Sequence, residues 1–360
     1  MKVFLKTLIL FLACLILVQA GLCAFIDPFN VFHPLNIRDN GVEPDKNYIK
    51  TSYILANPDK FDSFIFGSSR VGNIHGERIE GEKCYNMTYS QGTPQENLES
   101  IRVMLDAGIV PEHIYIGLDA SSYYFDTEEH LSSCLQSPYD YSVSHPVRFW
   151  AKYFNPAACG NSLFTSLEYR ISGNHMNSDF TGTFYDYGWN YDYGYDGGYD
   201  FDVSANPPGK CRAEMVSRLD AIDYSEAENF GNMRASLDAI RETVRLCEEN
   251  GIELTFFTNP LYYSLFAEAV CDNYYFYFLE KLAEITPFYN FSGFNDVTTD
   301  TSFYIEESHY SAEASDLVID GICLGNTDEN LLSQGFGVYV TEDSVSSLIE
   351  LLSANADFRI

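Results

Sequence analysis

Short apolar runs alternate along the chain with longer segments in which apolar side chains recur every three or four positions. The short runs are bounded by turn-forming residues, as buried strands are, whereas the longer segments are typical of helices that pack one face on a sheet. The predicted strands are 63–66, 84–88, 113–118, 252–258 and 288–291, and the predicted helices are 93–107, 225–250, 264–285 and 311–323. Strands that alternate with helices predict an α/β fold, with three layers (α/β/α) around a parallel sheet of about five strands.

Two segments break this alternation. A large insertion spans about 126–224 and contains a tract rich in tyrosine, aspartate and glycine at 184–200. Three interpretations of the tract stay open: a surface loop, a platform that stacks on sugar rings, or a calcium-binding loop, although its aspartate spacing does not fit an EF-hand. The tail after Gly325 predicts a strand at 335–340 and a helix at 342–353, which we expect to pack against the main sheet.

An uncharged, mostly apolar stretch at 7–25 follows Lys2 and Lys6. It is close to the roughly 20 residues that span a bilayer, and the two lysines predict that its N-terminal end faces the cytoplasm. Val18-Gln19-Ala20 resembles a cleavage site, so the stretch is either an uncleaved anchor, which we favour, or a cleaved signal peptide; both export the rest of the chain. The chain thus divides into a membrane segment at 1–26, a juxtamembrane segment at 27–60 and an α/β domain at 61–360.

Charge and cysteine content narrow the function. The formal net charge of −31 argues against nucleic-acid binding, because phosphate backbones need Lys and Arg, and it favours a neutral or cationic substrate. The chain has 9 cysteines and no CxxC motif, so we predict neither a zinc site nor a redox cofactor. Export permits disulfides, and Cys134 with Cys159 is the pair we consider inside the insertion; buried free thiols are the alternative.

Two short motifs carry the candidate chemistry. Gly67-Ser68-Ser69-Arg70 follows the first predicted strand, and Glu306-Glu307-Ser308-His309 lies far downstream, where we expect the acid and the imidazole on one turn near a helix start. A serine, a histidine and a carboxylate brought together by folding are what nucleophilic acyl chemistry needs. Ser69 would be the nucleophile, His309 the general base and Glu306 the group that orients the imidazole. The alternatives are a serine helix cap, a surface histidine and an acid that favours a helix N-terminus.

Polar residues follow several predicted strands. Ser69, Gly92, Asp119 and Asn259 all come just past strand ends, and in a parallel sheet these ends share one rim, where ligands bind. Arg70 either binds a substrate carboxylate or phosphate or pairs with a core carboxylate. Asn259, before Pro260, either contacts substrate or forms a strand-exit turn.

These motifs resemble those of the SGNH (GDSL-type) hydrolase superfamily. Gly67-Ser68-Ser69 stands where that family has Gly-Asp-Ser, and this form is similar to membrane-anchored relatives such as the D-alanyl transfer protein and glycan O-acyltransferases. Residues 86–92 resemble the second block, which ends in glycine, and Glu306 to His309 resemble the final Asp-x-x-His. The resemblance spans nearly the whole exported part and implies a flavodoxin-like SGNH fold.

The resemblance also implies an oxyanion hole. The backbone N–H groups of Ser69 and Gly92 would be two donors, and Asp119 stands at the third position, where the family has asparagine. An ionised aspartate cannot donate to an oxyanion, so either Asp119 is not the donor, or Ser121 or Ser122 substitutes, or catalysis is weak.

The expected function is therefore a membrane-tethered serine esterase or acyltransferase outside the cytoplasm. It would act on a small, acetyl-like O-acyl group of a cell-envelope glycan through an acyl-serine intermediate, without a cofactor. A transferase would work with a multi-span membrane protein that delivers the acyl group. The alternatives are a catalytically inactive SGNH-fold module that binds glycan or protein, and a purely structural exported protein. The sequence does not separate hydrolase from transferase.

Overall fold

A six-stranded sheet in the order β2-β1-β3-β4-β5-β8 lies at the centre of the protein. The structure, a computed structural model, describes residues 1–125, 127, 149–151, 153–172, 182–188, 203, 206–325 and 328–354. The first five strands of the order run parallel, and β8 pairs antiparallel with β5 at one edge. The strands are β1 (Ser63–Phe66), β2 (Cys84–Asn86), β3 (His113–Leu118), β4 (Glu253–Thr258), β5 (Phe288–Asn290) and β8 (Val338–Val340).

The predicted strands are confirmed in number and direction. Those at 63–66 and 113–118 have the predicted bounds, and the tail strand joins the sheet as the antiparallel β8. All four residues of β1 are buried, which is why this strand has a continuous apolar run rather than an alternating pattern. Its register sets Ile65 opposite Asn86 on one side and Tyr115 on the other.

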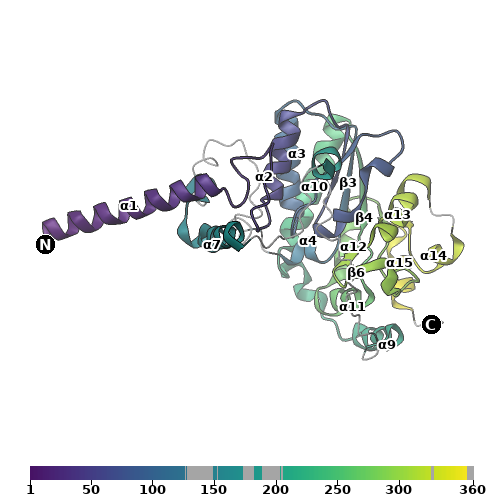
Figure 1. The fold of residues 1–360 in the computed structure, drawn as a ribbon. Coiled ribbons are helices and arrows are strands. Elements are labelled where there is room, and N and C mark those ends of the chain that lie inside the picture. The colour runs from purple at the N-terminus through teal and green to yellow at the C-terminus, as the bar shows by residue number, and fades with distance from the viewer. Residues whose placement is uncertain are drawn as a thin grey trace.

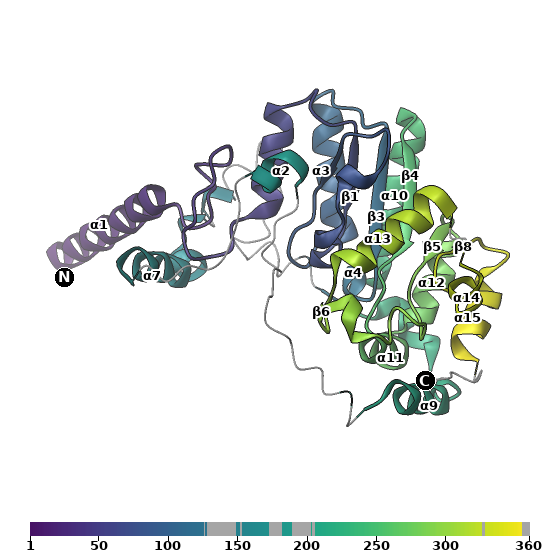
Figure 2. The same ribbon diagram turned by 45° about the vertical axis from the view of Figure 1, so that its right-hand side comes forward.

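Helices cover both faces of the sheet. α3, α10 and α12 pack side by side on one face, while α13 and the short turns η1 and η2 cover the other (Figure 2). The elements on the first face, with α2 and α15 beside them, are α2 (Lys46–Ala56), α3 (Pro94–Asp106), α10 (Met233–Asn250), α12 (Tyr275–Ala283) and α15 (Val345–Ser353). Those on the second are η1 (Ser69–Asn73), η2 (Gly76–Arg78) and α13 (Ala312–Asp320), which is followed by a π-helical turn, η6 (Gly321–Gly325).

Two long predicted helices are interrupted. The segment predicted at 225–250 contains η4 (Tyr224–Asn229) and then α10, separated at Gly231, which has a φ of 50°. The segment predicted at 264–285 divides into α11 (Tyr263–Asp272) and α12, because Tyr274 takes a left-handed φ of 55°. Tyr123 donates a hydrogen bond to the carbonyl of Asn273 at this break, a tertiary contact that the local sequence does not contain.

The remaining elements are short or belong to the insertion. They are α4 (Ser121–Tyr124), α7 (Pro156–Ser172), α8 (Gly182–Tyr187), α9 (Pro208–Leu219), η5 (Thr301–Phe303), β6 (Tyr304–Glu306), β7 (His309–Tyr310) and α14 (Glu329–Ser333). Within the Tyr/Asp/Gly tract, Phe184 is fully buried and its carbonyl accepts a hydrogen bond from Tyr85, so the start of the tract packs against β2. Residues 189–200 of the tract lie outside the described residues.

α1 (Lys2–Ile26) extends away from the α/β layers (Figure 1). Among the described residues it is the one helix long and apolar enough to cross a membrane, as an anchor or as a signal sequence. Its last turn packs into a second hydrophobic core, together with the first residues of the juxtamembrane segment and with residues in or near α7. We call this the junction core; it consists of Cys23, Ile26, Phe29, Val31, Phe149, Tyr153, Cys159 and Leu163. The juxtamembrane segment is therefore folded, and its helix α2 packs on α3.

The close packing of β3 against η1 generates a prediction. A Cβ on Gly117 would lie 2.4 Å from Cγ1 of Val71 and 2.9 Å from Cζ of Phe257. We expect Gly117→Ala to lower the free energy of unfolding by about 1–3 kcal/mol, because both neighbours belong to the packed core. Chemical denaturation of the purified protein measures the change.

Gly160→Ala is the matched control, because a Cβ there meets no atom within 4 Å and α7 is helical at this position. We expect it to be neutral or to stabilise the protein by up to about 1 kcal/mol. Equal effects of the two substitutions would contradict the packing described for Gly117.

Candidate active site

Ser69 lies at the point where β1 turns into η1. Gly67 takes a φ of 151°, and a Cβ there would lie 2.9 Å from the carbonyl oxygen of Gly117, so this turn needs glycine. Ser68 precedes η1 and its hydroxyl accepts the N–H of Arg70 at 3.4 Å, which caps the turn. The cap is thus Ser68, and the Ser69 hydroxyl is left for another partner.

That partner is His309. Nε2 of His309 lies 2.8 Å from Oγ of Ser69, across 240 positions of sequence. Nδ1 of the same ring contacts Oε1 of Glu306, and Oε2 of Glu306 accepts the N–H of Ser308 at 2.9 Å. A nucleophile, a base and an orienting carboxylate are therefore in hydrogen-bonding sequence, which is the arrangement required for an activated serine.

The acid and the imidazole face each other across a β-hairpin. Glu306 ends β6, His309 begins β7, and the two residues are directly paired in the antiparallel ladder. The expectation that they share one turn near a helix start is wrong, because α13 begins only at Ala312. The three-residue spacing nevertheless brings them together, because a two-residue turn places its flanking residues opposite each other.

The surroundings of Glu306 favour its ionised carboxylate, which can accept a hydrogen bond from Nδ1 of His309. Burial raises the pKa of its carboxyl, but the hydrogen bonds from His309 and from the Ser308 N–H outweigh burial, so the pKa is lower than usual. An ionised Glu306 fixes the imidazole ring through Nδ1 and stabilises the imidazolium that forms when His309 takes a proton.

A buried ion pair between Arg70 and Asp119 lies next to the triad. Nη1 of Arg70 donates to Oδ1 of Asp119 at 2.7 Å, and Asp119 is fully buried. Ser121 donates to the same oxygen through its N–H and its hydroxyl, and Asn259 donates to Oδ2 at 2.7 Å. Burial raises the pKa of Asp119, but Arg70 and the hydrogen bonds from Ser121 and Asn259 outweigh burial and leave the pKa below its usual value.

The same arginine holds the hairpin. Nε of Arg70 donates to the carbonyl of Ser308 at 3.0 Å, between the two hairpin members of the triad. Asn73, also on η1, donates to the carbonyl of Tyr310 at 2.8 Å. Two side chains of η1 therefore bind the backbone of the hairpin, and this fixes the position of His309 relative to Ser69.

The structure shows what surrounds Asp119 and Asn259. An ionised Asp119 that already accepts from Arg70, Ser121 and Asn259 has no proton to donate to an oxyanion. Asn259 is fully buried, its amide nitrogen donates to Asp119, and its amide oxygen accepts from the Tyr310 hydroxyl at 3.1 Å. Both ends of the amide are therefore bonded inside the protein, as in the predicted alternative of a strand-exit residue, and its contact with a substrate stays a prediction. For Arg70, the structure shows the predicted alternative of pairing with a core carboxylate.

Gly92 lies against the nucleophile turn. A Cβ on Gly92 would be 2.4 Å from the carbonyl oxygen of Gly67, closer than any side chain tolerates. Its N–H closes a turn to the carbonyl of Tyr89 at 3.3 Å, and Gln91 before it has a left-handed φ of 58°. Residues 86–92, which resemble the second block of the SGNH family, therefore end next to the turn that carries Ser69. The role of the Gly92 N–H as an oxyanion donor stays a prediction.

Sequence reasoning missed a second acid near the triad. Glu43 accepts from Lys46 at 3.1 Å and contacts the hydroxyl of Ser90. Burial raises the pKa of Glu43, but Lys46, Ser90 and the electrostatic interaction with His309 outweigh it and lower the pKa. No sequence motif indicated a role for Glu43, because it belongs to the juxtamembrane segment 27–60, which is interpreted as a connection.

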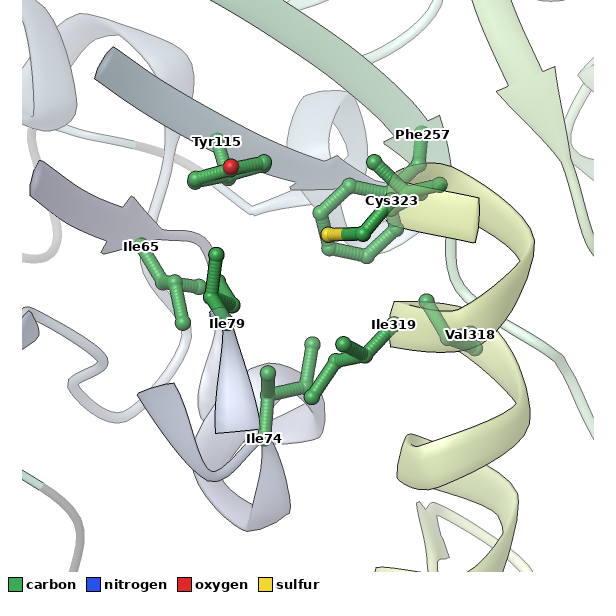
Figure 3. A pocket seen from close by; sticks show the side chains of 9 residues that line it. Ile65, Ile74, Ile79, Tyr115, Phe257, Val318, Ile319 and Cys323 are labelled. Atoms are coloured by element: carbon green, nitrogen blue, oxygen red, sulfur yellow. The ribbon is translucent and has the colours of Figure 1, made fainter. Parts of the chain in front are cut away.

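Two pockets flank this region. One, of about 200 Å³, adjoins the ion pair and is lined on its polar side by Arg70, Ser121, Glu268 and Asn273 and on its apolar side by α4 and α11 residues that include Tyr124 and Leu265. The other is a narrow apolar pocket between the sheet and α13, where Ile65, Tyr115 and Phe257 face Ile319 and Cys323 (Figure 3). No triad residue lines either pocket. Within the described ranges, no group of three His, Cys, Asp or Glu side chains is placed to hold a metal ion.

The buried pair generates a prediction about stability. Asp119→Asn removes the charge that compensates Arg70, whose side chain is 15% exposed. We expect a loss of about 3 kcal/mol in the free energy of unfolding, because one buried charge is left without its partner. The exposed Arg78–Asp316 pair is the control: Asp316→Asn should cost less than about 1 kcal/mol. A small effect of Asp119→Asn would contradict the assigned role.

The pH dependence gives an independent check. Because folding lowers the Asp119 pKa, the stability it supplies is fully present above its ordinary pKa of 3.8 and is lost as the pH falls through the lowered value. The free energies of unfolding of the wild type and Asp119→Asn should therefore differ at pH 6 and converge in strong acid. A difference that does not change with pH would show that the ionised carboxylate is not responsible.

Comparison of the chain with protein-family models, with curated proteins and with solved structures gives no match.

Proposed function

We propose that the protein is a serine esterase or acyltransferase of the SGNH type that acts on a small O-acyl group. One observation carries the proposal: the Ser69 hydroxyl, the two nitrogens of His309 and the Glu306 carboxylate are connected in that order, although Ser69 and His309 are 240 positions apart. A cap, a surface histidine and a helix-start acid would have no reason to meet in this order.

The chemistry follows from the three side chains. Nε2 of His309 takes the proton of the Ser69 hydroxyl as its oxygen attacks the ester carbonyl. The tetrahedral intermediate collapses when His309 returns that proton to the leaving alcohol, which leaves an acyl-serine. The acceptor then repeats the two steps in reverse: water gives a carboxylic acid and an esterase, whereas a sugar hydroxyl gives a new ester and an acyltransferase.

The sheet order supports the SGNH assignment. Strands 2-1-3-4-5 form one of the two common doubly wound orders, in which ligands bind beyond the carboxyl ends of the strands where the order reverses, between β1 and β3. Ser69 follows β1 and Asp119 follows β3, so the triad and its supporting ion pair lie at this place. The close approach of Gly92 to Gly67 further agrees with the glycine that ends the second block of the SGNH family.

The choice of substrate rests on charge and location. A net charge of −31 disfavours anionic polymers, and an N-terminal helix of membrane-spanning length suits work at a cell envelope. We therefore propose an acetyl-like group on an envelope glycan, with the domain on the extracytoplasmic face. A transferase would receive the acyl group from a multi-span membrane protein.

A catalytically inactive glycan- or protein-binding module is the second candidate. The observation that favours it is Asp119, which stands where the family has an amide donor and is occupied as an acceptor. Losing one oxyanion donor costs on the order of a hundredfold or more in rate, so the site is either slow or uses another donor.

A fluorophosphonate probe tests the proposal without the natural substrate. We expect the full-length protein in detergent to be labelled at Ser69, and labelling to be lost in Ser69→Ala and reduced at least a hundredfold in His309→Ala, because the probe reports an activated hydroxyl. Mass spectrometry of the labelled peptide locates the adduct.

Ser68→Ala is the matched control, since its hydroxyl accepts the N–H of Arg70, whereas His309 contacts the hydroxyl of Ser69. It should keep most of the labelling. Folded wild-type protein that is not labelled would overturn the catalytic proposal and favour the binding module.

A further inference from the structure

The end of the membrane helix contains a close pair of cysteines. Sγ of Cys23 lies 3.2 Å from Sγ of Cys159, and both side chains are fully buried in the junction core. Cys23 belongs to the last turn of α1 and Cys159 to the first turn of α7, two helices that contact each other (Figure 1). The predicted alternative pair, Cys134 with Cys159, cannot be compared because Cys134 lies outside the described residues.

Polar contacts on both sides of the sulfurs hold the two helices in this relation. The hydroxyl of Tyr153 donates to Oδ1 of the buried Asp27 at 2.6 Å, directly after α1. Arg170, at the other end of α7, donates to the carbonyl of Ile26 at 3.2 Å. Asn40 donates to the carbonyl of Asp27 at 2.6 Å. The pair is therefore surrounded by contacts that do not depend on the sulfurs themselves.

We propose that Cys23 and Cys159 form a disulfide that joins the membrane helix to α7. A disulfide has sulfurs about 2 Å apart, so the two thiols have to approach by roughly 1 Å to form the bond. The proposal rests on the exported location given under the proposed function, since such bonds persist in oxidising compartments. It does not depend on the activity of Ser69.

The reaction balances with a disulfide as the oxidant. A thiolate from one cysteine attacks an oxidised dithiol protein or oxidised glutathione, which forms a mixed disulfide and releases one thiol of the oxidant. The second cysteine then attacks this intermediate, so the Cys23–Cys159 bond forms and the oxidant's second thiol leaves. The two cysteines lose two protons and two electrons, and the electrons reduce the oxidant.

The bond would change how the site is held at the membrane. It closes a loop between residues 136 positions apart, and long loops are those in which a cross-link most restricts the unfolded chain. It would also keep α1 attached to the domain even after cleavage within 27–41. The bond would therefore add a covalent restraint to the packed junction between α1 and the α/β domain.

Peptide mapping of the full-length protein tests this directly. The protein is extracted from membranes in detergent with N-ethylmaleimide present, and is then digested with trypsin without reductant. We expect a linked species of peptides 7–38 and 153–170, which carry Cys23 and Cys159. It should disappear on reduction and be absent in Cys23→Ser and in Cys159→Ser.

Two controls make the result specific. Cys14→Ser keeps the link if Cys23, and not the other cysteine of peptide 7–38, is the partner, and Cys271→Ser, in a half-buried position of α11, should leave it unchanged. Reductant should lower the melting temperature of the wild type by several degrees and leave that of Cys159→Ser unaffected.

The outcomes separate this proposal from the catalytic one. Cys23 and Cys159 recovered as separately alkylated peptides, or Cys159 linked to Cys134, would overturn the disulfide even if Ser69 reacts with fluorophosphonate. A linked species in protein that fluorophosphonate does not label would support the disulfide and overturn only the catalytic assignment.

Discussion

The buried ion pair between Arg70 and Asp119 connects the sheet to the hairpin that carries Glu306 and His309. Ser69 is on a turn after β1, whereas Glu306 and His309 are on a two-stranded hairpin outside the main sheet. Arg70 bonds to Asp119 at the end of β3 and to the carbonyl of Ser308 in the hairpin, so one guanidinium connects the sheet to the hairpin. Such a group is costly to bury unless several acceptors surround it, and Asp119 and Ser308 provide them. The pair therefore serves the position of the triad as much as the stability of the fold.

This arrangement also explains the aspartate at position 119. In a site that needs an amide donor, an acid is a defect, but in this protein the acid neutralises an arginine that immediately follows the nucleophile. Ser121 and Asn259 complete its hydrogen bonds and keep it ionised. In the proposed reaction, a donor for the oxyanion would therefore come from elsewhere, such as the backbone around Ser69 and Gly92.

The residues around the end of α1 are packed into a hydrophobic core of their own. α1 does not leave the domain through a loose connection, because Cys23 and Ile26 enter a core with aromatic side chains of the first residues of the juxtamembrane segment and the region of α7. The juxtamembrane segment also contributes Glu43 near His309. The end of α1, residues 27–60 and the region of Ser69 and His309 are therefore connected by packed side chains, which relates the position of the candidate site to that of α1.

The sequence alone determined the elements whose causes are local. Apolar runs ending at turn residues located the five parallel strands, with β1 and β3 at their predicted bounds, and the length and composition of 7–25 identified a membrane-type helix. The spacing of Glu306 and His309 and the Gly67-Ser68-Ser69 motif predicted three residues whose side chains the fold brings into contact, while their catalytic roles stay a prediction.

Only the tertiary structure decided which side chains bind each other. Asp119 and Asn259 follow strand ends like site residues, yet their burial and their contacts with Arg70 and Tyr310 make them supports. The hairpin replaced the expected helical turn, and Tyr123 contacts the break between α11 and α12, because both depend on residues distant in sequence. Spacing along the chain predicts which residues are close within one element. Burial and long-range hydrogen bonds form only when the helices and the sheet have packed together.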